Sequence, residues 1–243
     1  MVVPAAEEYY NEFYRELSLL DARGNDFSKI ADLLTSELDD GRRARVADIG
    51  CGHGSVSGVL VDRGHAVYGV EIGDAALHTL VGRGIYPIKG DIAERLPIAD
   101  RTMNVVLLLD VLEHVFSPLW VLGEAHRILR PGGTVVVTVP LYFDLLDRLR
   151  LLFTGSILSY DNLAYGRVIA RRFRSYNYDH IRFFRPKDVD EMLAIAGFTI
   201  VQRVFGPIPS PRALGPLRHP LALFARLLPG LFAHSVKLKA TKA

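Results

Sequence analysis

The chain has 243 residues, 49% of them hydrophobic, which is enough to bury a sizeable core in one large α/β domain. Its single cysteine, Cys51, excludes an internal disulfide framework and fits a reducing compartment. The net charge of +2 is unevenly spread, because residues 1–140 carry 13 basic against 20 acidic residues and residues 141–243 carry 16 against 7. The basic half is therefore either a solvated surface or a surface for a partner.

The N-terminal third of the chain changes from a helical to a strand-rich pattern. Residues 7–40 place apolar side chains at helical spacing and predict helices. Short β-branched runs then alternate with helix-compatible stretches; they occupy residues 45–50, 65–72, 86–92, 103–110 and 132–140. Near-continuous apolar strands that alternate with helices predict a doubly wound, mostly parallel sheet of the α/β class.

The regular alternation stops after Pro140. Residues 141–180 show no clear strand and are predicted to be an insert after strand five. A helix over residues 185–197 follows, and then strands over 198–206 and 234–242, which bring the sheet to seven strands. The chain is thus predicted to be one domain, with an N-terminal helical lid at 1–44, a cofactor-binding core at 45–140, an acceptor-binding insert at 141–180 and a C-terminal helix with strands at 181–243.

A glycine-rich segment, DIGCGHG at residues 48–54, follows the first predicted strand. Such a turn before a helix lets a ligand approach bare backbone near the helix N-terminus. Gly50, Gly52 and Gly54 form GxGxG, but Ser55 stands where a dinucleotide fingerprint has glycine, and the GK[ST] end of a phosphate-binding loop is absent. The segment on its own is also compatible with a purely structural turn.

Acidic residues follow the next three predicted strands. Glu71 lies 21 residues after Gly50, where an acid accepts hydrogen bonds from ribose hydroxyls, and Asp91 and Asp110 end the third and fourth strands. Carboxylates in this crevice suit a ligand with a ribose, an exocyclic amine and a positive centre better than one with phosphates. The alternative for each acid is a helix cap or a loop charge.

Five segments in this order resemble the motif series of class I S-adenosylmethionine-dependent methyltransferases: DIGCGHG, VYGVEIG, GDIAERLPIAD, VVLLLDVLEHV and HRILRPGGTVVVTVP. The resemblance covers residues 45–140, and DHIRFFRPKDVDEMLAIAGF at 179–198 is similar to a later helix of the family. It implies a Rossmann-like methyltransferase fold, with S-adenosylmethionine as the cofactor.

The resemblance also implies positions for the cofactor. The residues that it assigns to cofactor binding are Asp48, Gly50, Cys51 and Gly52 at the methionine end, Glu71 and Ile72 at the ribose, Asp91 and Ile92 at the adenine, Asp110 after the fourth strand, and the lid residue Tyr14, with Tyr10 beside it.

Candidate catalytic residues follow the fourth predicted strand. Asp110, Glu113 and His114 fall at i, i+3 and i+4, so a helical turn would present them on one face. His114, with Glu113, is a candidate general base, or the three residues hold a divalent metal such as Mg²⁺ or Mn²⁺ that acidifies the acceptor. LEHV resembles ubiquinone-pathway O-methyltransferases, in which an acid–acid–His group is associated with a metal; here the first acid is an aspartate. A helix cap is the structural alternative, and His180 beside Asp179 is a second candidate base.

The insert is expected to select the acceptor. Residues 141–187 hold 10 of the 23 aromatic residues and 9 basic against 4 acidic residues. We expect a hydroxyl of a polar small molecule, a sugar or oligosaccharide first, with a quinone or phenol precursor or a lipid-linked metabolite as the alternative. Methylation of RNA or protein is a third reading, disfavoured because no Asn/Asp-Pro-Pro-Tyr stretch follows strand four and no nucleic-acid-binding module is visible. A cofactor-fold scaffold without activity and a nicotinamide oxidoreductase are the non-methyltransferase alternatives.

The expected location is the cytoplasm. The N-terminal residues lack the basic segment of a signal peptide, and no stretch reaches the roughly 18 uncharged apolar residues of a membrane span. Contact of residues 221–232 with a membrane surface is left open.

Overall fold

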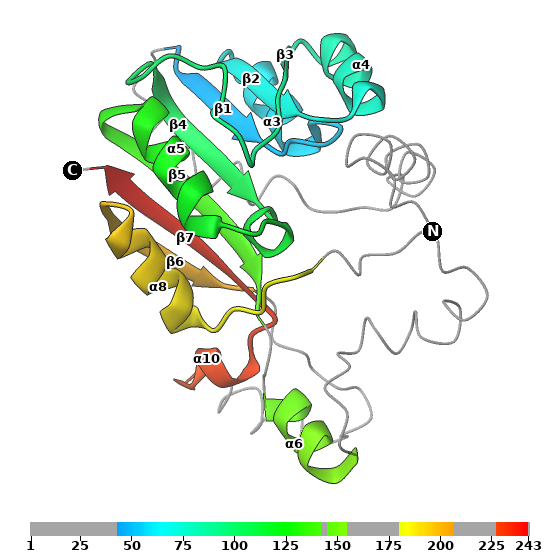
Figure 1. The fold of residues 1–243 in the computed structure, drawn as a ribbon, viewed down its shortest axis with the longest axis vertical. Coiled ribbons are helices and arrows are strands. Elements are labelled where there is room, and N and C mark those ends of the chain that lie inside the picture. The colour runs from blue at the N-terminus through cyan, green and yellow to red at the C-terminus, as the bar shows by residue number, and fades with distance from the viewer. Residues whose placement is uncertain (1–42, 142–144, 155–179, 207–226, 243) are drawn as a thin grey trace.

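The computed structural model describes residues 43–141, 145–154, 180–206 and 227–242, and its centre is a seven-stranded sheet (Figure 1). In chain order the strands are β1 Arg45–Ile49, β2 Ala66–Glu71, β3 Tyr86–Lys89, β4 Met103–Leu109, β5 Leu129–Pro140, β6 Phe198–Phe205 and β7 Ser235–Lys242. They lie side by side in the order β3-β2-β1-β4-β5-β7-β6. The predicted seven-stranded α/β sheet is confirmed.

Strands β1 to β5 are parallel, and β7 runs antiparallel between β5 and β6. Crossover connections join the parallel strands, as this direction of pairing requires; they run through helices except between β3 and β4, where a loop makes the crossover. The carboxyl ends of β1, β2, β3 and β4 therefore meet at one edge of the sheet. Open α/β sheets bind ligands at this edge, where the strand order reverses between β1 and β4.

Both faces of the sheet are covered at its central strands, so β4 is apolar almost without interruption. Alternate residues of β4 point to opposite faces: Val105 and Leu107 pack into one cluster of buried residues, and Val106 and Leu108 pack into the other. The first cluster is closed by α3 (Ser55–Asp62) and α4 (Asp74–Gly82), and the second by α5 (Pro118–Ile128) and α8 (Pro186–Ile195). This two-sided burial accounts for the apolar runs in the sequence.

The helix predicted over residues 185–197 is α8. Pro186 occupies its first turn, the backbone N–H of Arg185 donates to the Asp188 carboxylate (2.7 Å), and Gly197 beyond its end has φ +84°. Helix α8 packs against α5 and β6, which attaches the C-terminal part of the chain to the helix that precedes β5. The predicted strand at residues 234–242 is β7.

Two helices of the C-terminal half lie away from the sheet. Helix α6 (Leu145–Thr154), within the insert, was not predicted from the sequence; it contacts α10 (Pro229–Phe232), and the pair forms the lower end of the molecule in Figure 1. None of the helices in the described ranges is long and apolar enough to cross a bilayer. The N-terminal lid, with Tyr10 and Tyr14, and the middle of the insert lie outside the described residues.

Candidate functional site

The glycine-rich segment forms a tight turn between β1 and α3. Gly50, Gly52 and Gly54 all have positive φ angles, +69°, +52° and +69°, which glycine adopts without steric cost. A Cβ atom on Gly50 would lie 3.0 Å from the Cγ2 atom of Val111, so the turn is in close contact with the segment that follows β4. The turn therefore brings bare backbone and the N-terminus of α3 to the carboxyl edge of the sheet.

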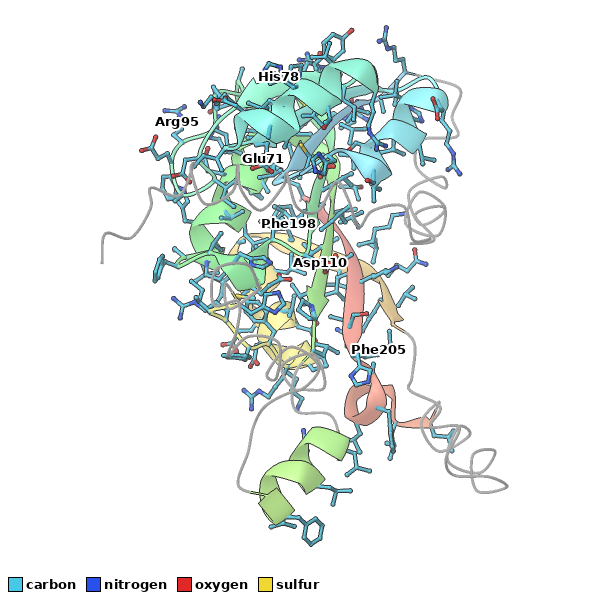
Figure 2. All side chains as sticks on the ribbon, turned by 90° about the vertical axis from the view of Figure 1, so that its right-hand side faces the viewer. Glu71, His78, Arg95, Asp110, Phe198 and Phe205 are labelled. Atoms are coloured by element: carbon cyan, nitrogen blue, oxygen red, sulfur yellow. The ribbon has the colours of Figure 1, made fainter. Side chains whose placement is uncertain are left out.

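Glu71, the last residue of β2, lies across from this turn. Its carboxylate is 4% exposed and accepts hydrogen bonds from the backbone N–H groups of Gly52 (3.1 Å) and Ile72 (2.8 Å). Figure 2 labels Glu71 and Asp110, which lie at the ends of β2 and β4. The backbone N–H of Gly73 also donates to Oε1 of Glu71 (3.3 Å), so three backbone amides orient the carboxylate at this edge of the sheet.

Asp48 lies beneath the turn, inside the protein. The Ser57 hydroxyl donates a hydrogen bond to its carboxylate, and Asp48 is 3% exposed. Burial raises the pKa of Asp48 to about 6, the Ser57 hydrogen bond opposes the rise, and the neighbouring Glu71 charge adds to it. Burial, with the charges of Asp48 and Glu71, also raises the pKa of the Cys51 thiol well above its usual range, so this thiol is protonated at neutral pH and is no nucleophile.

The loop after β3 carries the two residues assigned to the adenine. The Asp91 carboxylate accepts a hydrogen bond from the backbone N–H of Ala93 (2.8 Å), which forms a compact turn. Ile92 is partly buried and packs against the larger apolar cluster. Asp91 and Ile92 therefore stand at the same strand-end edge as Glu71.

Asp110 follows β4 in a left-handed conformation, with φ +54°. Its backbone N–H donates to the Thr138 hydroxyl (3.0 Å), and its carboxylate accepts a hydrogen bond from the same hydroxyl (2.9 Å). The expectation of one helical turn across Asp110, Glu113 and His114 is wrong, because the left-handed residue interrupts the helix. Only residues Leu112–His114 form a short 3-10 helix, η1.

Two segments bring Glu113, His114 and His180 together. Glu113 and His114 lie in η1, and His180 lies in the segment before α8. Glu113 is fully buried, and its Oε1 atom lies 3.8 Å from Nε2 of His114 and 3.9 Å from Nε2 of His180. The two imidazole rings meet edge to face, with centroids 4.6 Å apart. The backbone carbonyl of Glu113 accepts hydrogen bonds from Ile181 (2.9 Å) and Arg182 (3.1 Å), which fixes the second histidine beside the first.

The structure thus unites the two candidate bases that the sequence presents separately. One ligand atom from each of Glu113, His114 and His180 lies within 4.8 Å of the others, so the three residues have the spacing of a candidate cation site. Asp110, expected as a metal ligand, is instead held by Thr138. Sequence reasoning also missed Ser57 and Thr138, whose positions on α3 and β5 carry no motif of their own.

The seven-stranded order with β7 reversed, the glycine turn after β1 and the acid at the end of β2 together define a class I S-adenosylmethionine-dependent methyltransferase. A family model described as a methyltransferase domain matches residues 22–203, and the chain belongs to this family.

Two similar relatives are ubiquinone biosynthesis O-methyltransferases. The protein from Burkholderia thailandensis is 29% identical over 164 residues, which cover 65% of this chain and 66% of the relative. The protein from Rhizobium rhizogenes is 28% identical over 164 residues, covering 65% of this chain and 61% of the relative. The match therefore spans less than two thirds of the length of each of these proteins.

Solved structures agree on the fold. A methyltransferase from Archaeoglobus fulgidus superposes with a TM-score of 0.64 at 17% identity. The superposition covers 94% of this chain and 100% of the Archaeoglobus chain. Magnesium protoporphyrin IX methyltransferase from Synechocystis superposes with a TM-score of 0.58 at 16% identity. The superposition covers 100% of this chain and 90% of the Synechocystis chain. At these identities the likeness establishes the fold alone.

Proposed function

We propose that the chain transfers a methyl group from S-adenosylmethionine to a hydroxyl of a phenol or quinol ring. The observation that carries the proposal is the buried Glu113 carboxylate, which lies less than 4 Å from both the His114 and the His180 imidazole, next to the segment that packs on the glycine turn. The names of the two relatives favour this ring hydroxyl over the sugar hydroxyl that the sequence led us to expect first.

The cofactor is proposed to lie along the carboxyl edge of the sheet. Glu71 accepts its ribose hydroxyls, Asp91 and Ile92 flank its adenine, and the Asp48 carboxyl under the glycine turn faces its positively charged end. When bound, S-adenosylmethionine supplies a methyl group on a sulfonium, and the acceptor oxygen forms the new C–O bond as the C–S bond breaks and its electron pair stays on sulfur.

The histidines supply the proton chemistry that a ring hydroxyl needs. One neutral imidazole takes the hydroxyl proton as the C–O bond forms, and the proton later passes to water. Glu113 stabilises the imidazolium that forms, because an ionised carboxylate less than 4 Å from the ring nitrogen favours its protonated form. The backbone bonds from Ile181 and Arg182 to the Glu113 carbonyl hold the pair in place.

A divalent cation is a second way for the same residues to act. One carboxylate and two imidazoles form a donor set that suits Zn²⁺ or Mn²⁺ better than Mg²⁺, which prefers oxygen ligands. Such a cation would lower the pKa of the acceptor hydroxyl. This ligand set differs from the Asp110-containing set expected from the sequence by exchanging Asp110 for His180.

Turnover of ring hydroxyls tests the proposal. Release of S-adenosylhomocysteine is measured with an ortho-dihydroxybenzene acceptor such as 3,4-dihydroxybenzoate, a demethylated quinol with a short side chain, and a free hexose. We expect release with the ring compounds and none with the hexose. Release with the hexose alone would contradict the phenolic acceptor.

Substitutions in the cluster test the mechanism. We expect Glu113→Gln, and one of His114→Gln and His180→Gln, to lower kcat about a hundredfold, which is the contribution of a positioned base. Binding of S-adenosylhomocysteine should be unchanged. His78→Gln, on the exposed face of α4, is the matched control and should retain full activity. A wild-type kcat in all three cluster variants would show that the cluster takes no part in the reaction.

Removal of divalent cations with EDTA distinguishes the two mechanisms, in which either a histidine acts as the base or a cation activates the acceptor hydroxyl. Full turnover in excess EDTA supports proton transfer to an imidazole that binds no metal. Loss of turnover in EDTA that Zn²⁺ or Mn²⁺ restores supports the cation, provided that His114→Gln no longer responds to the added metal.

A further inference from the structure

The loop between β3 and β4 has no regular secondary structure from residue 90 to 102, yet it directly follows the strand end where the adenine is proposed to bind. Its first turn contains Asp91 and Ile92. The position of these two residues therefore depends on what holds the rest of the loop. Most of the hydrogen bonds that hold it come from one helix, α5.

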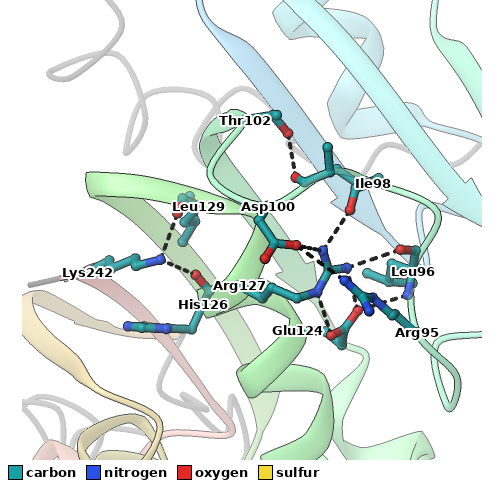
Figure 3. Close-up of polar contacts among 11 residues, drawn as sticks. Arg95, Leu96, Ile98, Asp100, Thr102, Glu124, His126, Arg127, Leu129 and Lys242 are labelled. Atoms are coloured by element: carbon teal, nitrogen blue, oxygen red, sulfur yellow. Dashed lines mark hydrogen bonds and ion pairs between the residues drawn. The ribbon is translucent and has the colours of Figure 1, made fainter.

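The centre of these contacts is the guanidinium group of Arg127 (Figure 3). One of its terminal nitrogens donates to the carbonyl of Ile98 (2.8 Å) and to the carboxylate of Asp100 (2.6 Å). The other donates to the carbonyl of Leu96 (3.1 Å) and to the carboxylate of Glu124 (2.7 Å).

All five N–H donors of this group are engaged, because the Nε–H also donates to Glu124 (2.8 Å). Glu124 in turn accepts a hydrogen bond from the backbone N–H of Leu96 (2.8 Å), so the loop is held at both its carbonyl and its amide groups. The side chain of Arg127 is 17% exposed. A planar fork with five donors matches this set of acceptors, and a lysine ammonium with three donors does not.

A third residue of α5 extends the contact toward the adenine turn. The indole N–H of Trp120 donates to the carbonyl of Glu94 (3.4 Å). Trp120, Glu124 and Arg127 fall at i, i+4 and i+7, so they share one face of the helix and bind successive parts of the loop. Helix α5 begins shortly after His114 in η1, so one rigid element borders the proposed acceptor chemistry and holds the adenine loop.

We infer that Arg127 is a positioning residue for the cofactor: it fixes the β3–β4 loop on α5 and thereby sets the positions of Asp91 and Ile92. The inference rests on the proposed place of the adenine. The residue acts through the loop and touches neither cofactor nor acceptor. Its loss should weaken cofactor binding while the chemical step, carried by η1 and the segment before α8, proceeds at its normal rate.

The loop has further anchors that keep a variant folded. The backbone N–H groups of Arg101 and Thr102 donate to carbonyls at the end of α5, at 3.0 and 2.8 Å, whatever side chain stands at position 127. The side chains of Leu96 and Ile98 are buried, 3% and 7% exposed. Substitution of Arg127 is therefore expected to loosen the loop without unfolding the domain.

The test compares Arg127→Met and Arg127→Lys with the wild-type chain. We measure the Kd of S-adenosylhomocysteine and of adenosine by calorimetry, at a temperature well below the Tm of every variant. We expect Arg127→Met to raise both Kd values about tenfold, in the range for a residue that acts without touching the ligand, and Arg127→Lys to give a smaller rise. With an accepted ring compound, the KM for S-adenosylmethionine should rise with the Kd while kcat stays within about threefold of wild type.

Lys242→Met is the matched control for a general loss of stability. The Lys242 ammonium donates to the carbonyls of His126 (2.6 Å) and Leu129 (2.8 Å), at the same end of α5 as Arg127, and makes no hydrogen bond to the loop itself. The Lys242→Met variant should have a lower Tm than the wild-type chain and the same Kd values for both ligands. Unchanged Kd values in Arg127→Met, or an equal weakening in Lys242→Met, would overturn the inference.

The two proposals fail separately. The binding measurement contains no acceptor, so a chain that methylates no phenol still tests the role of Arg127. Conversely, loss of turnover in Arg127→Met with an unchanged Kd overturns the positioning role and leaves the ring-hydroxyl proposal standing. If Arg127→Met yields no folded protein, the Kd values of Arg127→Lys decide, since that variant retains a charge beside Asp100 and Glu124.

Discussion

Replacing Asp48 with asparagine should make the protein more stable at neutral pH, although the residue is proposed to face the cofactor. The carboxyl group is buried, and its pKa is raised from 3.8 to about 6, chiefly by loss of hydration. One pKa unit corresponds to about 1.4 kcal/mol, so ionised Asp48 lowers the free energy of unfolding by about 3 kcal/mol. Asparagine carries no charge and still offers an oxygen to the Ser57 hydroxyl.

Because the pKa of Asp48 is higher in the folded than in the unfolded chain, the stability of the wild-type protein depends on pH in a definite direction. Well below pH 4, Asp48 is protonated in both folded and unfolded chains, and ionisation costs nothing. Between about pH 4 and 6 the unfolded chain releases the proton and the folded chain keeps it, so the wild-type stability falls as the pH rises. Above about pH 6 the full cost of about 3 kcal/mol is present.

Urea unfolding from pH 4 to 8 measures the difference between the Asp48→Asn and wild-type free energies. We expect a difference of about 0.5 kcal/mol at pH 4 that grows to about 3 kcal/mol in favour of the variant above pH 6. Ser57→Ala is the companion variant, because it removes the hydrogen bond that lowers the pKa of Asp48 and should shift the midpoint of the pH dependence upward. A difference that is constant over this pH range would refute the reasoning.

The same substitution should weaken cofactor binding, because a neutral amide replaces a carboxylate beside a positively charged ligand. A gain in stability with a loss of affinity is typical of binding sites that retain an unfavourable buried charge for function. Bound S-adenosylmethionine favours the ionised carboxylate, so we expect its affinity for the wild-type chain to fall as the pH drops below about 6.

The sheet could be predicted from the sequence because parallel strands buried on both faces leave a strong local signal. Val105 to Leu109 is apolar at every position, and the structure shows why: alternate residues fill two different clusters. Glu71 could be placed at a strand end because it ends the apolar run of β2. The helix over residues 185–197 carries proline and glycine at its ends, which are local signals too.

The arrangement within the candidate site depends on contacts that leave no local pattern. The spacing of Asp110 and His114 is that of a helical turn, but Asp110 adopts a positive φ and exchanges two hydrogen bonds with the Thr138 hydroxyl, one donated by its N–H and one accepted by its carboxylate. His180 joins Glu113 only because backbone bonds tie residues 181 and 182 to η1. Such pairings between segments distant in the chain are set by the tertiary fold, which single-sequence patterns do not contain.

Substitutions at three other positions test separate parts of the structure. Glu71→Ala should weaken S-adenosylhomocysteine binding at least about tenfold in calorimetry, since a charge-assisted hydrogen bond contributes about 1.5–3 kcal/mol; wild-type affinity would contradict its ribose role. Gly54→Ala should lower the free energy of unfolding in urea by about 1–3 kcal/mol, because φ is +69° and the added methyl group would lie 2.5 Å from an isoleucine and 2.8 Å from a leucine side chain. Gly64→Ala, with φ +91° and open space, should show the smaller backbone cost alone. Lys242→Met removes a buried ammonium that donates to two carbonyl oxygens at the end of α5, at 2.6 and 2.8 Å, and joins the last strand to that helix. Loss of these charge-assisted bonds should lower the free energy of unfolding by about 2 kcal/mol. Lys237→Met, on the same strand, should cost less than about 0.5 kcal/mol, and equal losses in the two variants would show that the ammonium is not what stabilises this junction.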